Sequence, residues 1–237
     1  MNKKFAFTLT EMLITLSIIG VVSAMTVPTL MNKYQKEAQA VQIRKASLEF
    51  ANAVDLYLTE KGKTTLAGTD IADNLSDFIE SYFKITKTCG EDDTSCFASS
   101  YRSIDNTKTS SVNCSGDYYT LANSASICVN AYKLLNISSG SVQVNKTNAS
   151  RPYLKIVMDT NGAEKPNIGG RDIFTFYITK TGELTGTEPY NMELITQSPC
   201  LCLEGKDCDC EDPKCENSPL GDYCFNLLAN NNWVMNY

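Results

Sequence analysis

The residues of this 237-residue chain that could carry chemistry are ten cysteines and Glu11, the one carboxylate inside a long apolar run. Histidine is absent, which excludes Ser-His-Asp and Cys-His catalysis, histidine-ligated metals and a histidine pH switch. No nucleophile elbow, phosphate-binding loop or HExxH motif can be read either. The chemistry that the sequence predicts is therefore disulfide formation in an oxidising compartment and ion pairing by Glu11, not enzymatic catalysis.

The overall composition narrows the class of protein further. The net charge is −6 and the pI is about 4.8, so we expect no nucleic-acid partner, because phosphate neutralisation needs clustered Lys and Arg. Hydrophobic residues make up 43% and charged residues 20%, which is typical of neither a disordered chain nor a polytopic membrane protein.

The apolar run extends from Phe7 to Leu30, and a helix of this length reaches about 36 Å, enough to cross a bilayer. Three interpretations compete. The run is a secretory signal peptide cleaved after Ala24, a plain membrane anchor, or an apolar segment in which the carboxylate of Glu11 has a specific role. Glu11 disfavours the first two, because a carboxylate in lipid is costly unless a cation pairs with it.

The residues Lys3-Lys4-Phe5-Ala6-Phe7-Thr8-Leu9-Thr10-Glu11 resemble the class III signal of type IV pilins and type II secretion pseudopilins. The resemblance implies cleavage between Ala6 and Phe7 by a prepilin peptidase and N-methylation of Phe7. It also implies that Glu11, as the fifth mature residue, pairs with the freed amine of a neighbouring subunit. Ala6 stands where the family usually has Gly, and Thr10 stands where an aliphatic residue is common.

The resemblance further implies a structural subunit that assembles with copies of itself and with other pilins into a type IV pilus or a type II secretion pseudopilus. Its partners would be the prepilin peptidase and an inner-membrane assembly platform with its ATPase. The chain would cross the bacterial inner membrane once, with an exported head that reaches the periplasm or the cell surface. The alternatives are a minor or tip pilin whose head binds a surface, DNA or cargo, a membrane-anchored exported enzyme, and a soluble secreted binding protein.

We expect three parts: a cleaved leader (1–6), a long helix (7–60) that spans the membrane at 7–30, and a head (61–237) with a cysteine-rich acidic segment (200–224). Apolar residues at steps of three and four predict that one face of the helix packs on its own domain, and Gly62 is a suitable helix end. The residues of this buried face are Ile43, Ser47, Phe50, Val54 and Tyr57.

The head has short apolar runs separated by turn residues, which predict strands, after one short helix at 71–83. The loop 122–125 suits a hairpin, and Thr181-Gly182 suits a turn. A long helix followed by such strands predicts an α+β, pilin-like fold with an antiparallel sheet laid on the helix. The predicted strands are 118–121, 126–129, 142–144, 154–158 and 173–178.

The cysteines predict a disulfide-braced head. Cys89 and Cys96 flank a short acidic loop that a disulfide would close, and Cys114 and Cys128 form a second predicted pair. The last six allow many connectivities, and their C-x-C elements leave a soft-metal cluster as an alternative to disulfides. These six are Cys200, Cys202, Cys208, Cys210, Cys215 and Cys224.

One loop of the head, residues 159–172, is conspicuous for its spacing of polar residues. It resembles the D-x-N-G…P-N…G-x-D-x-F segment of a group of pilin-like proteins, so we interpret it mainly as a fold signature. The same group often closes with a C…G-W pattern, matched here by Cys224 and Trp233, with Asn232 at the Gly position. We expect no cofactor. The alternative is Ca²⁺ held by Asp159, Asn161 and Asp172, although the full EF-hand spacing is missing.

Overall fold

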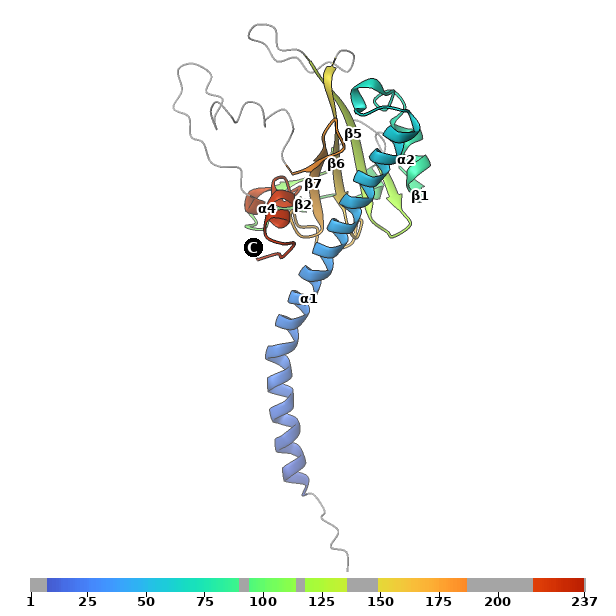
Figure 1. Ribbon diagram of the computed structural model, residues 1–237. Helices are drawn as coiled ribbons and strands as arrows, with labels where there is room; N and C mark the ends of the chain where they lie inside the picture. The colour runs from blue at the N-terminus through green and yellow to red at the C-terminus, as the bar shows by residue number, and fades with distance from the viewer. Residues whose placement is uncertain (1–7, 90–93, 114–117, 136–148, 187–214, 237) are drawn as a thin grey trace, which may run out of the picture. The chain divides into compact units, whose positions relative to one another are not determined.

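The computed structural model describes residues 8–89, 94–113, 118–135, 149–186 and 215–236. It shows one long helix and an antiparallel sheet, which confirms the predicted α+β fold class (Figure 1). By the clustering of contacts the chain divides into two compact units, Met1–Ala38 and Gln39–Tyr237. The helices are α1 (Leu9–Glu60), α2 (Leu75–Tyr82) and α4 (Cys224–Asn230), with 3-10 turns at Leu66–Gly68, Thr94–Cys96 and Cys215–Asn217.

Helix α1 continues through Pro28 and ends next to Gly62, whose φ of +62° is easily adopted only by a residue without a side chain. In the first unit its apolar side chains are exposed. In the second unit one face is buried, and it includes every residue of the predicted stripe. The buried residues of α1 are Ala40, Ile43, Ala46, Ser47, Phe50, Ala53, Val54, Tyr57 and Leu58.

Six strands form one antiparallel sheet in the order β1-β4-β5-β6-β7-β8. Strands β4 and β5 form the predicted hairpin, in which the Leu121 N–H donates to the Ala125 carbonyl oxygen and Ser124 takes a positive φ. The strands are β1 (Ile85–Thr88), β4 (Tyr118–Leu121), β5 (Ser126–Leu135), β6 (Ala149–Asp159), β7 (Ile173–Ile178) and β8 (Leu184–Thr185).

The main core lies between α1 and one face of this sheet. Strand residues alternate between the two faces, and Ile127, Ile156 and Phe176 point toward the helix. Phe50 of α1 meets Phe176 edge-on, with ring centroids 5.9 Å apart. Truncation of a buried Phe to Ala lowers the free energy of unfolding by about 3–5 kcal/mol, so each of these two rings contributes substantially to the stability of the head.

A second, smaller core lies on the other face of the sheet. Tyr118, Val157 and Ile173 face away from α1 and pack against Phe97 and Tyr101. The chain 94–113 covers this face and contains a two-stranded hairpin of β2 (Tyr101–Arg102) and β3 (Thr109–Ser110). The sheet is thus covered on both faces, which the sequence pattern did not indicate.

The sequence predicted some elements to the residue and missed others. Strands β4 and β7 have the predicted bounds, β5 and β6 are longer, and the predicted strand 142–144 lies outside the described residues. The helix expected at 71–83 was too long, because Asp73 and Asn74 donate their N–H groups to the Asp70 carbonyl oxygen and form a turn before α2 begins. Strands β1, β2 and β3 and helix α4 were not predicted.

Candidate functional site

The amino-terminal end of α1 is held by a reciprocal cap between Thr8 and Glu11. The Thr8 N–H and Oγ1 both donate to Glu11 Oε2 at 2.8 Å, and the Glu11 N–H donates to Thr8 Oγ1 at 3.3 Å. This is the geometry of a capping box, in which two residues three apart satisfy each other's free groups. The cap therefore fixes where the only carboxylate of the apolar run lies. Ala6 and Phe7, which flank the predicted cleavage site, lie outside the described residues.

The helix beyond this cap is apolar on all sides. Among the described residues α1 is the one helix long and apolar enough to cross a membrane, judged by length and composition, and its most apolar window has no buried residue. Leu9, Ile18 and Met25 are each more than half exposed. A helix that is apolar all round needs either lipid or other helices around it.

This end of the chain is similar to a known family of sequences: residues 1–27 match the prokaryotic N-terminal methylation motif. This motif is typical of type IV pilins and pseudopilins, so the resemblance read from the sequence is confirmed. The chain thus combines this signal with a pilin-like α+β fold, a long helix laid on an antiparallel sheet. No curated protein and no solved structure matches the chain.

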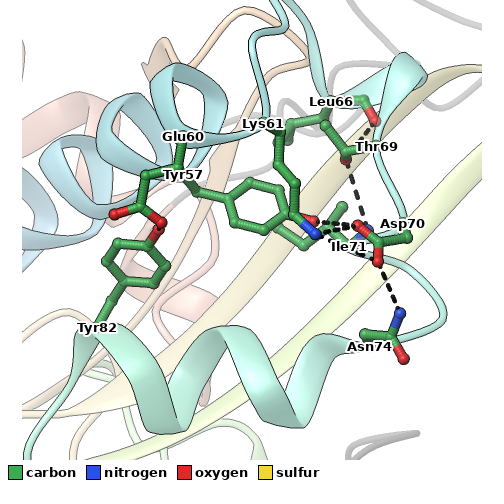
Figure 2. Close-up of polar contacts among 9 residues, drawn as sticks. All are labelled: Tyr57, Glu60, Lys61, Leu66, Thr69, Asp70, Ile71, Asn74 and Tyr82. Carbon is green, nitrogen blue, oxygen red and sulfur yellow. Dashed lines mark hydrogen bonds and ion pairs between the residues drawn. The ribbon is translucent and has the colours of Figure 1, made fainter.

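At the other end of α1, a polar network joins the helix to the segment that follows it (Figure 2). Asp70 is its centre: one carboxylate oxygen accepts from the Tyr57 hydroxyl at 2.8 Å and lies 3.1 Å from Lys61 Nζ, while the other accepts from Asn74 Nδ2 at 2.9 Å. The hydrogen bonds from Tyr57 and Lys61 lower the pKa of Asp70. Desolvation and the Asp70 carboxylate raise the pKa of Tyr57 to about 12.

A second phenol–carboxylate pair lies beside the first. The Tyr82 hydroxyl of α2 donates to Glu60 Oε2 at 2.5 Å, and desolvation together with this carboxylate raises the pKa of Tyr82 to about 12. Helix α1 thus supplies a phenol to the loop and a carboxylate to α2 (Figure 2). The two pairs fasten residues 61–82 to the last turn of the helix. Sequence reasoning missed them, because Tyr57 and Asp70 are 13 residues apart and no periodicity relates them.

The cysteines of the described chain form disulfides, as predicted. Cys89 pairs with Cys96, and Cys215 pairs with Cys224, a connectivity that the sequence left open. Cys128 is also disulfide-bonded. Its predicted partner, Cys114, lies outside the described residues, as do four other candidates: Cys200, Cys202, Cys208 and Cys210.

The loop 159–172 packs tightly around two buried carboxylates. Asp159 Oδ2 accepts from the Tyr101 hydroxyl at 2.5 Å, and its Oδ1 accepts from the Asn161 N–H at 3.1 Å. Asp172 accepts from the N–H groups of Asn167 and Ile168 at 2.5 and 2.6 Å. Burial raises the pKa of both carboxyl groups, that of Asp159 to about 7 with a further contribution from the Asp172 charge.

The three predicted calcium ligands all lie in this loop. All four carboxylate oxygens already accept hydrogen bonds, and no third acidic or cysteine side chain joins the pair among the described residues. Asn161 Oδ1, in contrast, is buried and has no hydrogen-bond partner in the part of the chain that is described. Calcium binding at Asp159, Asn161 and Asp172 therefore stays a prediction. Its test is a rise of the melting temperature in calcium that Asp159→Ala abolishes.

The loop 159–172 also lies close to a disulfide of the carboxy-terminal part of the head. Gly170 has φ +79°, and a Cβ there would lie 2.6 Å from Cys224 Sγ. The loop is thus pressed against the Cys215–Cys224 disulfide. Near the carboxy-terminal end, Asn232 has φ +52°, a conformation that Gly adopts most easily. Trp233 meets Phe225 edge-on under the guanidinium of Arg44.

Proposed function

We propose that this chain is a prepilin: a structural subunit that a prepilin peptidase cleaves between Ala6 and Phe7 and that then assembles into a type IV pilus or a type II secretion pseudopilus. The observation that carries the proposal is the methylation motif on the residues that cap α1. An assembly platform and its ATPase would extract the subunit from the inner membrane. Other pilins and copies of the same chain would be its partners in the filament.

The chemistry of Glu11 supports this proposal. In the capped helix the carboxylate is stabilised by the N–H and hydroxyl groups of Thr8, which lowers the cost of holding it in lipid before assembly. Cleavage before Phe7 frees an α-amine one residue from Thr8. A carboxylate held at a fixed position can then accept that cation from a neighbouring subunit, and a paired charge is tolerated in an apolar surrounding where a single one is not.

The exposed apolar helix supports assembly as well. In the membrane, lipid surrounds its side chains; on leaving the membrane the same side chains need other helices around them. Disulfides in the head are consistent with export, because they persist in oxidising compartments and not in a reducing cytosol.

Substitution of Glu11 tests the proposal. In cells that express the prepilin peptidase and the assembly machinery, we expect Glu11→Ala to be cleaved and to stay in the membrane but to be missing from sheared filaments. Glu37→Ala, which removes an acidic residue of the same helix outside the apolar run, is the matched control and should assemble normally. Filaments that contain Glu11→Ala at the unaltered level would refute the pairing.

A further inference from the structure

A groove runs along α1 in the head, at the β1 edge of the sheet. It has a volume of about 350 Å³ and lies between one side of α1, the end of α2 and the turn between β4 and β5. Leu56, which lines it, is 57% exposed, and Phe83 and Leu121 form its apolar walls. The two sides are tied together where the Ala122 N–H donates to the Lys84 carbonyl oxygen at 2.9 Å.

Cationic side chains outnumber acidic ones in the lining of the groove. Lys45 and Lys84 line it, and the one acidic side chain, Glu49, already lies 3.7 Å from Lys45. Lys84 forms no ion pair with any residue of the described chain. Asn123 uses its amide oxygen for the Ala125 N–H at 3.1 Å, which leaves its amide nitrogen as a donor. Donors beside apolar walls fit a carboxylate that is flanked by apolar groups.

The chain itself contains a segment of this chemistry. Residues 187–214 hold seven carboxylates against two lysines, and leucines and cysteines lie among them, as in Leu203-Glu204. The segment leaves the described chain at Gly186, after β8, and returns at Cys215. Both ends are fixed to α4: the Gly186 N–H donates to Asn226 Oδ1 at 2.7 Å, and Cys215 is bonded to Cys224.

The groove and the ends of this segment lie at opposite edges of the same sheet. Lys84 precedes β1, the first strand of the sheet order, and Gly186 follows β8, the last; Figure 1 shows α2 and β1 on one side of the head and α4 on the other. A contact between the groove of one copy and the segment of another therefore joins two different surfaces. Such heterologous contacts produce a ring where the rotation between copies closes and an open, helical assembly where it does not, so the contact is compatible with a filament.

We propose that the groove lined by Lys45, Lys84 and Asn123 binds the acidic segment 187–214 of a second copy of this chain. The inference rests on the proposed assembly and names the head surface that takes part in it. It does not depend on cleavage before Phe7 or on Glu11. The contact is a polar, charge-complementary one, so salt weakens it.

Cross-linking of the full, uncleaved chain in detergent micelles tests the contact directly. Equal amounts of ¹⁴N- and ¹⁵N-labelled protein are mixed and treated with a carbodiimide, which joins a lysine amine to a carboxylate only where the two touch. We expect peptides that link Lys84 to a carboxylate between Glu204 and Asp212 and that carry both labels. Links confined to a single label, or no link to Lys84, would overturn the proposal.

Charge reversal gives an independent test by sedimentation of the same protein. We expect Lys84→Glu to weaken self-association by about tenfold, and a second chain with Asp207→Lys and Asp209→Lys to restore association when the two are mixed. Lys63→Glu, the same change at an exposed lysine outside the groove, is the control and should associate as the unaltered chain does. Normal association of Lys84→Glu contradicts the proposal. Cross-linked copies of a chain that cells leave uncleaved would instead count against the proposed function and leave this contact standing.

Discussion

At the scale of single residues, two carboxylates show how position decides what an acid does. Glu11 lies in an apolar helix and is stabilised by Thr8, which makes it available for a later partner. Asp70 lies at the surface and already has its partners, since Tyr57, Lys61 and Asn74 all bind its two oxygens. Under the proposed function the first carboxylate takes part in assembly, whereas the second holds a loop in place.

The lowered pKa of Asp70 predicts an acid-dependent loss of stability. A carboxyl group whose pKa is lower in the folded state stabilises the fold above its unfolded pKa, about 3.9, and that stabilisation disappears as the pH falls through the lowered value. We therefore expect Asp70→Asn to lower the melting temperature at neutral pH, with a difference that shrinks toward about pH 2. Thermal unfolding followed by circular dichroism measures this.

Glu80→Gln is the control for that experiment, because Glu80 is an exposed acid of α2 that lies outside the network and outside the first turn of the helix. Its melting temperature should follow that of the unaltered chain at every pH. A difference for Asp70→Asn that stays constant from neutral to strongly acid pH would show that the carboxylate charge does not hold the loop.

At the scale of elements, the loop 159–172 and the disulfide beneath it form one packed unit. Gly170 fits because it has no side chain: its φ is +79°, and the Cys224 sulfur occupies the space where a Cβ would lie. An L-residue in that conformation costs about 1–2 kcal/mol before any clash is counted. The disulfide and the glycine therefore depend on each other.

We expect Gly170→Ala to destabilise the head by about 2 kcal/mol or more, because strain and clash add. Gly20→Ala is the control, since nothing lies within 4 Å of a Cβ at that position of α1. Urea unfolding of the two variants in detergent measures the difference. Equal midpoints for Gly170→Ala and the unaltered chain would mean that the loop does not press on the disulfide.

How far the sequence predicted each element follows from the strength of its pattern. The buried face of α1 and the strands β4 and β7 were predicted because their apolar residues repeat at helical spacing or form runs bounded by turn residues. Strands β1, β2 and β3 have two to four residues, most of them exposed, so they leave no period to detect. Helix α4 has only seven residues, begins at Cys224 and directly follows Tyr223, which has a positive φ, so its sequence gives no recognisable helix start.

The site was predictable to a different degree. Glu11 could be identified from the sequence because a carboxylate within an apolar run is costly and therefore indicates a specific role. The spacing of Thr8 and Glu11 is also that of a capping box. The bonds of Asp70 to Tyr57 and of Asp159 to Tyr101 were not predictable. They join residues that only the folded chain brings together, and single carboxylates in polar loops are common.

At the scale of the whole molecule, the described chain combines an uncovered apolar helix with a head that has its own packed cores. The head has two cores, one on each face of its sheet, and disulfides that brace it. The apolar first half of α1 is not covered by any other part of the described chain. A helix that is apolar all round needs lipid or other helices around it. Under the proposed function, neighbouring subunits take the place of lipid when the chain enters a filament.

The most direct measurement is the mass of the amino-terminal peptide of the protein isolated from envelopes of cells that have a prepilin peptidase. The account predicts a chain that begins at Phe7 and is heavier by one methyl group at its α-amine. A chain that begins at Met25, or one that keeps residues 1–6, would contradict it.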